Sequence, residues 1–176
     1  KKIGGFLPVT QVKSFTEPVT ITATTTNPIK ATVALSDYIN IVDDGSGWCT
    51  VTMSYRHASS LGSTAGNGQY IFKLPAGYKF DNTVHPVYNV DVTAIPTFPI
   101  LAQIIPGSFG FATGRGANQQ VHALAYSDNQ FRLVTGVGLQ GAGLTVNEFI
   151  RSNYFQMTIG ANNDMSYNIS FQFKKQ

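Results

Sequence analysis

Histidine and cysteine are the residues that most often bind metals or act in nucleophilic catalysis, and this chain has three histidines and one cysteine. Their spacing supports neither role. His57, His85 and His122 lie far apart, whereas zinc ligands on one element recur a few residues apart. His85 precedes a proline and is expected in a turn, and His122 falls on the polar side of an alternating segment. Cys49 falls on the apolar side of another such segment, where burial makes a thiol unreactive. We therefore expect no metal site and no cysteine nucleophile.

Carboxylates are the remaining candidates for acid–base chemistry. The nine acidic residues are spread along the chain, and a glycosidase-like pair is close in space rather than in sequence, so the sequence leaves a small opening for one. Aspartates in or beside turns commonly bond the local backbone, and four are placed in this way: Asp81, Asp91, Asp128 and Asp164. No Gly-x-Ser-x-Gly elbow occurs either. We expect no enzyme, no catalytic residue and no cofactor.

Two loops match the sequence patterns of ligand-binding motifs but lack the flanking structure that those motifs require. Residues 136–141 read Gly-x-Gly-x-x-Gly, but a dinucleotide site needs a full helix and a parallel strand, and the next predicted strand follows too soon. Residues 43–47, Asp-Asp-Gly-Ser-Gly, lack the alternating oxygen ligands and closing glutamate of a calcium loop. We expect a flexible loop and a hairpin turn, with calcium between subunits at residues 43–47 as an open alternative.

The composition favours a protein that binds copies of itself. Of 176 residues, 43% are hydrophobic and only 12% are charged, about half the usual charged share. A surface made of Thr, Ser, Asn, Gln and Gly suits strands, turns and broad protein contacts. The chain is long enough for one domain with a sizeable core. No stretch approaches the roughly eighteen apolar residues of a membrane span, so no membrane partner is expected.

The basic residues are scattered, apart from a pair at each end of the chain. The formal net charge is +3, and only Lys1-Lys2 and Lys174-Lys175 are adjacent. A nucleic-acid binder usually concentrates Lys and Arg, because neutralising phosphates supplies most of the affinity. We expect nucleic acid, if it is bound, to meet the chain at Lys1 and Lys2.

Alternating segments recur from end to end and predict strands separated by turns rich in Gly, Pro, Asn and Asp. The clearest are residues 165–173, 49–55, 19–24 and 121–126; weaker candidates are 30–35, 70–74, 87–92, 109–113, 130–135 and 153–159. Residues 144–152 predict one short helical turn. This count predicts an all-β domain over residues 1–176, a two-sheet antiparallel β-sandwich in which residues 1–16 form an extended N-terminal arm.

One apolar segment, residues 92–105, is interrupted by Pro96 and Pro99, which deny it a regular central-strand ladder. We expect a sheet edge or a contact between subunits, supported by the loops at residues 58–68 and 139–152. The apolar side chains predicted to make that contact are Ile95, Phe98, Ile100, Leu101, Ile104 and Ile105.

Residues 68–81, Gly-Gln-Tyr-Ile-Phe-Lys-Leu-Pro-Ala-Gly-Tyr-Lys-Phe-Asp, contain a strand that ends in Leu-Pro-x-Gly, with an aromatic residue before the Asp. This pattern resembles one found in small viral jelly-roll proteins. The resemblance covers residues 48–81 and, more loosely, the last two predicted strands. It implies a jelly-roll coat protein of a small spherical virus, present in the virion, whose copies assemble into an icosahedral shell around a viral genome.

The same resemblance leaves alternatives open. A trimeric receptor-binding head of a viral or phage fibre is similar in general plan, and a cellular sandwich domain such as a lectin or adhesin comes third. The chain departs from many small coat proteins because it has no arginine-rich arm, and Lys1-Lys2 stands where the end of such an arm would be.

Overall fold

The computed structural model describes residues 11–32, 36–58, 62–64, 66–89, 104–114, 117–135 and 164–176. Within them the chain forms nine strands and no helix, so no helix long and apolar enough to cross a membrane occurs in this part. The strands are β1 Lys13–Glu17, β2 Thr20–Ala23, β3 Ser36–Asp43, β4 Trp48–Ala58, β5 Tyr70–Lys73, β6 Phe109–Gly114, β7 Ala117–Ser127, β8 Gln130–Thr135 and β9 Asp164–Lys174. The expectation of an all-β chain is confirmed for these residues.

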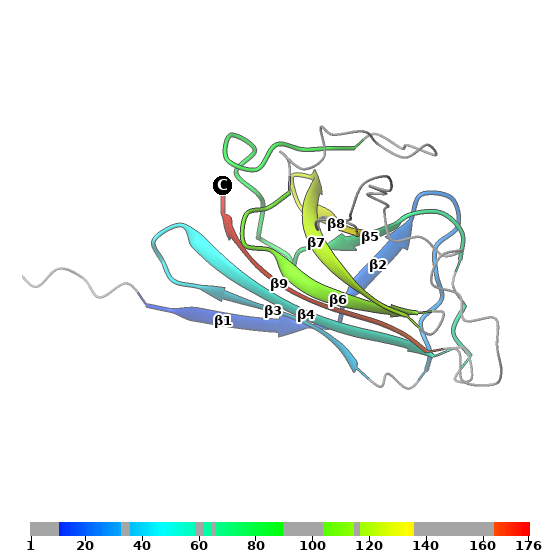
Figure 1. Cartoon of the computed structure of the whole chain (residues 1–176). Helices are drawn as coiled ribbons and strands as arrows, with labels where there is room; N and C mark the ends of the chain where they lie inside the picture. Colours follow the sequence, from blue (N-terminus) through cyan, green and yellow to red (C-terminus); the bar gives the residue numbers. More distant parts are fainter. Residues whose placement is uncertain are drawn as a thin grey trace, which may run out of the picture.

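The nine strands form one continuous antiparallel sheet in the order β1-β3-β4-β9-β6-β7-β8-β5-β2. β1 and β2 lie at opposite edges of this order, yet only Pro18 and Val19 separate them in the chain. A link of that length spans at most roughly 11 Å. The two edges must therefore approach each other, and the sheet curls back on itself (Figure 1). Its division into the two separate sheets of a jelly roll stays a prediction.

The curl places two layers face to face with the core between them. We call β1, β3, β4, β9 and β6 the lower layer and β7, β8, β5 and β2 the upper layer (Figure 1). Aromatic rings join the two layers: Tyr70 and Phe72 of β5 lie 5.9 and 5.7 Å from Tyr167 of β9, measured between ring centroids. Phe131 of β8 lies 5.1 Å from Phe171 of β9. These contacts join strands that lie far apart in the sheet order, so one core serves both layers.

Strand β9 is the strand whose sequence pattern predicts its structure most directly. Tyr167, Ile169, Phe171 and Phe173 alternate with polar residues, and all four are buried. Successive side chains of a strand point to opposite faces. The apolar residues therefore line the core, and the polar ones point away from it.

The predicted strands are confirmed wherever the alternation is strong, and two strands were missed. Segments 165–173, 49–55, 121–126, 109–113 and 130–135 lie within β9, β4, β7, β6 and β8. β5 covers all but the last residue of 70–74, and β2 covers most of 19–24. β1 and β3 were not predicted. The described parts of 30–35 and 87–92 are not strands, and residues 144–152 and 153–159 lie outside the described residues.

The predicted N-terminal arm overlaps a strand. Residues from Lys13 onward belong to the edge strand β1, which pairs with β3, while residues 1–10 lie outside the described part. β1 buries little, because almost every one of its side chains is exposed. Its attachment depends on the backbone ladder and on Asn40 Oδ1, which accepts hydrogen bonds from the hydroxyls of Ser14 and Thr16 at 3.1 and 2.8 Å.

Gly110 allows β6 to approach β9. A Cβ at this position would overlap the backbone carbonyl of Asn168 and the Cα of Ile169 on the neighbouring strand. Neither atom belongs to a side chain that can rotate away. The ladder that joins the last strand to the middle of the sheet therefore requires a residue without a Cβ at position 110.

We predict that Gly110→Ala lowers the free energy of unfolding by on the order of 1–3 kcal/mol, because overpacking against backbone forces the two strands apart. Chemical denaturation measures this loss. Lys73→Ala, an exposed position on β5, is the control and should change the stability by less than about 0.5 kcal/mol. Equal stability of Gly110→Ala and the unmodified protein would contradict the close approach of β6 and β9.

Candidate interaction surface

The lower layer turns one broad face away from the core, and we call it the outer face. Its side chains come from alternate positions of five adjacent strands, as the pairing register defines. They are Ser14, Thr16, Ser36, Tyr38, Asn40, Val42, Trp48, Thr50, Thr52, Ser54, Arg56, Phe109, Phe111, Ser166, Asn168, Ser170, Gln172 and Lys174. All are exposed or half-buried, so this face lies open in the isolated chain.

The register arranges these side chains in rows across the strands. One row runs Phe111, Asn168, Ser54, Tyr38, and the next runs Phe109, Ser170, Thr52, Asn40. Both rows place a phenylalanine on β6 beside short polar residues on β9 and β4. The outer face therefore has an aromatic ridge along β6 and a lower polar trough along β9 and β4.

Four large apolar side chains of this face are exposed: Trp48, 42% exposed, lies at one end beside Lys174, and three others lie farther along the strands. Phe109, Phe111 and Tyr38 are 51%, 47% and 41% exposed. The two phenylalanine rings lie 5.1 Å apart in an edge-to-face arrangement, so each limits the motion of the other. An exposed aromatic cluster rimmed by polar residues is typical of a protein interaction site.

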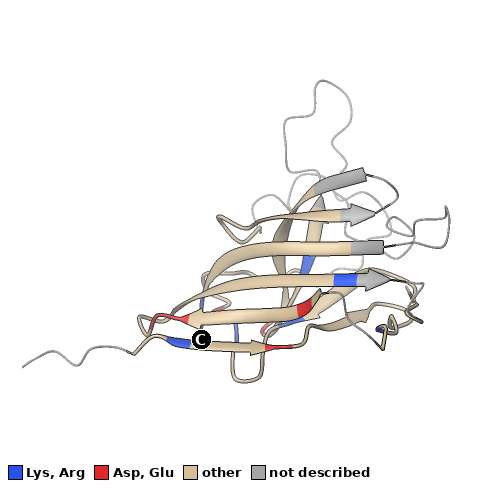
Figure 2. Ribbon diagram, turned by 90° about the horizontal axis from the view of Figure 1, so that it is seen from below, with Lys and Arg blue, Asp and Glu red and all other residues tan. Residues whose placement is uncertain are grey.

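Charge is confined to the ends of the outer face. Among its described side chains only Arg56 and Lys174 are charged, and they lie at opposite ends of the paired strands β4 and β9. Figure 2 shows the face from below, with most of its strand length uncharged. A surface without charge can approach an identical surface without like-charge repulsion.

Hydrogen bonds within the sheet hold several polar side chains of the trough in place. The Ser170 hydroxyl donates to the Val51 carbonyl at 3.1 Å, and the hydroxyls of Ser36 and Ser54 lie 2.6 Å apart. The Asn168 amide donates to the Ser166 hydroxyl at 3.1 Å. These bonds leave short, oriented groups, which lose little conformational entropy when a partner covers them.

The upper layer contrasts with the lower, because the chain itself covers several of the outward side chains of β7 and β8. Leu124 and Val134 are fully buried there, with Tyr88 and Ile104 packed against them. Arg132 is buried beside them and donates to Gln69 Oε1 at 2.5 Å and to the Tyr88 carbonyl at 2.7 Å. Its guanidinium also lies 4.7 Å from the ring centroid of Tyr126.

This packing bears on the contact residues expected from the sequence. Ile104 is half-buried against Leu124, and Ile105 lies in the main core, 1% exposed. Both side chains are thus used within their own chain. Ile95, Phe98, Ile100, Leu101, Lys1 and Lys2 lie outside the described residues. The outer face was not predicted, because its rows form only when distant strands pair.

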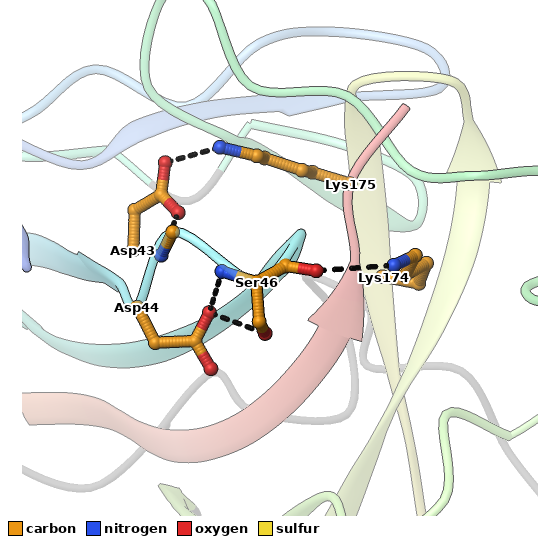
Figure 3. A network of polar contacts seen from close by, with 6 residues as sticks. Asp43, Asp44, Ser46, Lys174 and Lys175 are labelled. Carbon is orange, nitrogen blue, oxygen red and sulfur yellow. Dashed lines mark hydrogen bonds and ion pairs between the residues drawn. The ribbon is translucent and has the colours of Figure 1, made fainter. Parts of the chain in front are cut away.

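The acidic loop at residues 43–47 is the hairpin turn between β3 and β4, as predicted. Asp43 Oδ1 accepts the Gly45 amide at 2.9 Å, and Asp44 Oδ1 accepts the Ser46 amide at 2.8 Å. Asp43 also forms an ion pair with Lys175 (Figure 3). The Lys175 hydrogen bond is the main reason that the pKa of Asp43 is lowered. The carboxylates thus serve the turn and the chain end.

The C-terminal lysine pair fastens this turn to β9. Lys174 Nζ donates to the Ser46 carbonyl at 3.4 Å (Figure 3) and lies 5.9 Å from the ring centroid of Trp48. Lys175 is held by Asp43. The described side chains contain no group of three or more His, Cys, Asp or Glu residues placed to hold a metal ion.

His85 belongs to the same corner and has a structural role. Its ring is buried against Trp48 and Phe80, and Nε2 accepts the Lys174 amide at 2.9 Å. Nδ1 is buried with no hydrogen-bond partner in the described part of the chain. Burial lowers the pKa of His85, although the nearby Asp81 opposes this effect. A neutral ring is required, because a protonated Nε2 cannot accept a hydrogen bond.

The two other groups weighed in the sequence are also structural. Cys49 is buried in the core, and burial raises the pKa of its thiol to about 11, so the thiolate is disfavoured at neutral pH. His122 is half-buried, and its Nδ1 lies 2.6 Å from the Ser108 carbonyl. Because a carbonyl only accepts, Nδ1 carries the proton. The ring of His57 lies outside the described side chains.

We predict that the protein loses stability as the pH falls below about 6.5, the ordinary pKa of histidine. The unfolded chain then binds a proton that folded His85 resists, and linkage favours unfolding. Melting temperatures at pH 7.5 and 5.5 measure the effect. His85→Gln keeps an acceptor for Lys174 and should show a smaller decrease, whereas Val84→Gln, an exposed position that leaves His85 in place, should behave like the unmodified protein. An equal decrease in His85→Gln would contradict this role.

Comparison of the chain with protein-family models, with curated proteins and with solved structures finds no match.

Proposed function

We propose that this chain is a structural protein that works by binding copies of itself, as the jelly-roll coat subunit of an icosahedral viral shell. The observation that carries the proposal is the open outer face, which spans five strands, has little charge and keeps Phe109, Phe111 and Tyr38 in solvent. A freely dissolved monomer gains nothing from these exposed aromatic side chains on one face. In a subunit of an assembly, the same side chains can be buried in a contact with another copy.

The fold suits such a subunit. The aromatic core joins both layers, and the β3–β4 turn is fastened to the end of β9 by Asp43 and Lys175. A rigid block with preformed faces avoids the entropy cost of ordering itself during assembly. Repetition of one modest contact in a closed particle then multiplies its effect.

Contact with a genome falls to the N-terminal side under this proposal. Lys174 and Lys175 are engaged with Ser46, Trp48 and Asp43, so the C-terminal pair is already committed within the chain. Lys1 and Lys2 remain the proposed nucleic-acid-facing residues. They precede the exposed edge strand β1 in the sequence.

We predict that the purified protein forms particles of megadalton mass, with an absorbance ratio at 260 and 280 nm that indicates nucleic acid. Light scattering and absorbance on one chromatographic peak measure both quantities. A trimer without nucleic acid would favour the alternative, the receptor-binding head of a viral or phage fibre. A monomer at every protein concentration would contradict self-assembly itself.

A further inference from the structure

We infer that two copies of this chain pack outer face to outer face about a two-fold axis, which runs parallel to the strands above the boundary between β4 and β9. The inference rests on the proposed self-assembly and names the surface and the geometry that it uses. Its occupant is a second copy of the chain.

The order of strands makes the outer face self-complementary about that axis. β9 and β6 lie one and two strands to one side of the boundary, and β4 and β3 lie equally far to the other side. A two-fold axis along the boundary therefore places β6 of one copy opposite β3 of the second copy, and β9 opposite β4. Such an interface uses the same patch on both copies.

Two pairs of side chains in these rows then match in size and chemistry. Phe111 of one copy lies opposite Tyr38 of the second, because both belong to one row at equal distances from the boundary. In the adjacent row Ser170 lies opposite Thr52. Phe109 in that row lies opposite Asn40, a shorter polar side chain. On each side of the axis one aromatic pair therefore meets, the β6 ridge of each copy lies over β3 of the other, and the polar side chains of β9 and β4 face one another.

Charge supports a second copy as the occupant. The axis brings like ends of the two copies together, so Arg56 approaches Arg56 and Lys174 approaches Lys174, but both pairs lie at the rim of the face, where water and salt screen them. An acidic or basic partner would find no complementary field in the middle of the face. An identical uncharged face meets no repulsion there.

The size of the face indicates how strong the contact is. Four strand spacings of about 4.8 Å and a strand length of about eight residues give a footprint of roughly 500 Å². A standard stable interface buries about 800 Å² per partner. Packed sheets also diverge by about 30°, so the match is best near the centre. We therefore expect a weak pair that persists when further contacts of an assembly reinforce it.

Covalent capture tests the inference, because it detects weak pairs. Thr52→Cys and Ser170→Cys variants are mixed in equal amounts and treated with a short thiol crosslinker. The positions face each other across the axis, and the native Cys49 is buried and gives no background. The control is Lys73→Cys, an exposed position on the upper layer. We expect at least tenfold more covalent dimer from the mixture than from the control variant.

A second pair of variants checks that the aromatic ridge drives the contact. Phe111→Glu should abolish crosslinking in the mixture and reduce particle formation, while the melting temperature stays within a few degrees, because about half of the side chain is exposed and it lies outside the core. Val84→Glu is the matched control, since it replaces an apolar side chain of similar exposure, 46%, outside the outer face. This control should crosslink and assemble normally.

The outcomes separate this inference from the proposed function. Particles that form without crosslinking at positions 52 and 170, and that tolerate Phe111→Glu, would overturn the two-fold contact and leave self-assembly standing. Equal crosslinking by Lys73→Cys would overturn it as non-specific collision. A chain that stays monomeric, and whose binding to a neutral polysaccharide depends on Phe111, would overturn both and identify the face as a glycan site.

Discussion

The pairing of β4 with β9 is the constraint on which the rest of the structure depends. The ladder runs over the full length of both strands, from Trp48 opposite Lys174 to Ala58 opposite Asp164. β3 and, through it, β1 are attached to the sheet only by β4, and β6 is the other neighbour of β9. Without this ladder the sheet would divide into two parts, neither of which could close the core. Because side chains alternate, the same two strands also supply the trough of the outer face.

The two layers differ in whether their outward side chains are covered by the chain or left exposed to solvent. In the upper layer, Tyr88 and Ile104 pack against Leu124 and Val134, and the guanidinium of Arg132 is buried beside them. That burial desolvates a charge, which costs free energy unless hydrogen bonds and aromatic rings compensate for it. The lower layer keeps its outward face free of charge along most of the strands and uncovered. A surface of this kind costs little to dehydrate, so it suits a partner that arrives later.

Local sequence pattern predicted the strands better than it predicted the surface. β9 was evident from strict alternation, and the turn at residues 43–47 from its Asp and Gly residues, because both signals are local. β3 was missed because Asp37 and Asn40 weaken its strand signal, although the Asp37 carboxylate accepts the Val19 amide and pairs with Lys30. β1 was missed because an edge strand need not alternate. Ile105 was expected at a contact because an apolar run between prolines does not reveal which of its members turns inward.

The central place of β9 has a consequence for how the chain reaches its fold during synthesis. Both edge strands, β1 and β2, leave the ribosome first, whereas the strand that joins the middle of the sheet is made more than a hundred residues later. At about 5–20 residues per second, the nascent chain carries β4 without its neighbour for several seconds or longer. The apolar side of β4 and its unpaired edge are exposed to other nascent chains in that interval. Polyribosomes that make this protein are therefore places where premature pairing between chains competes with completion of the sheet.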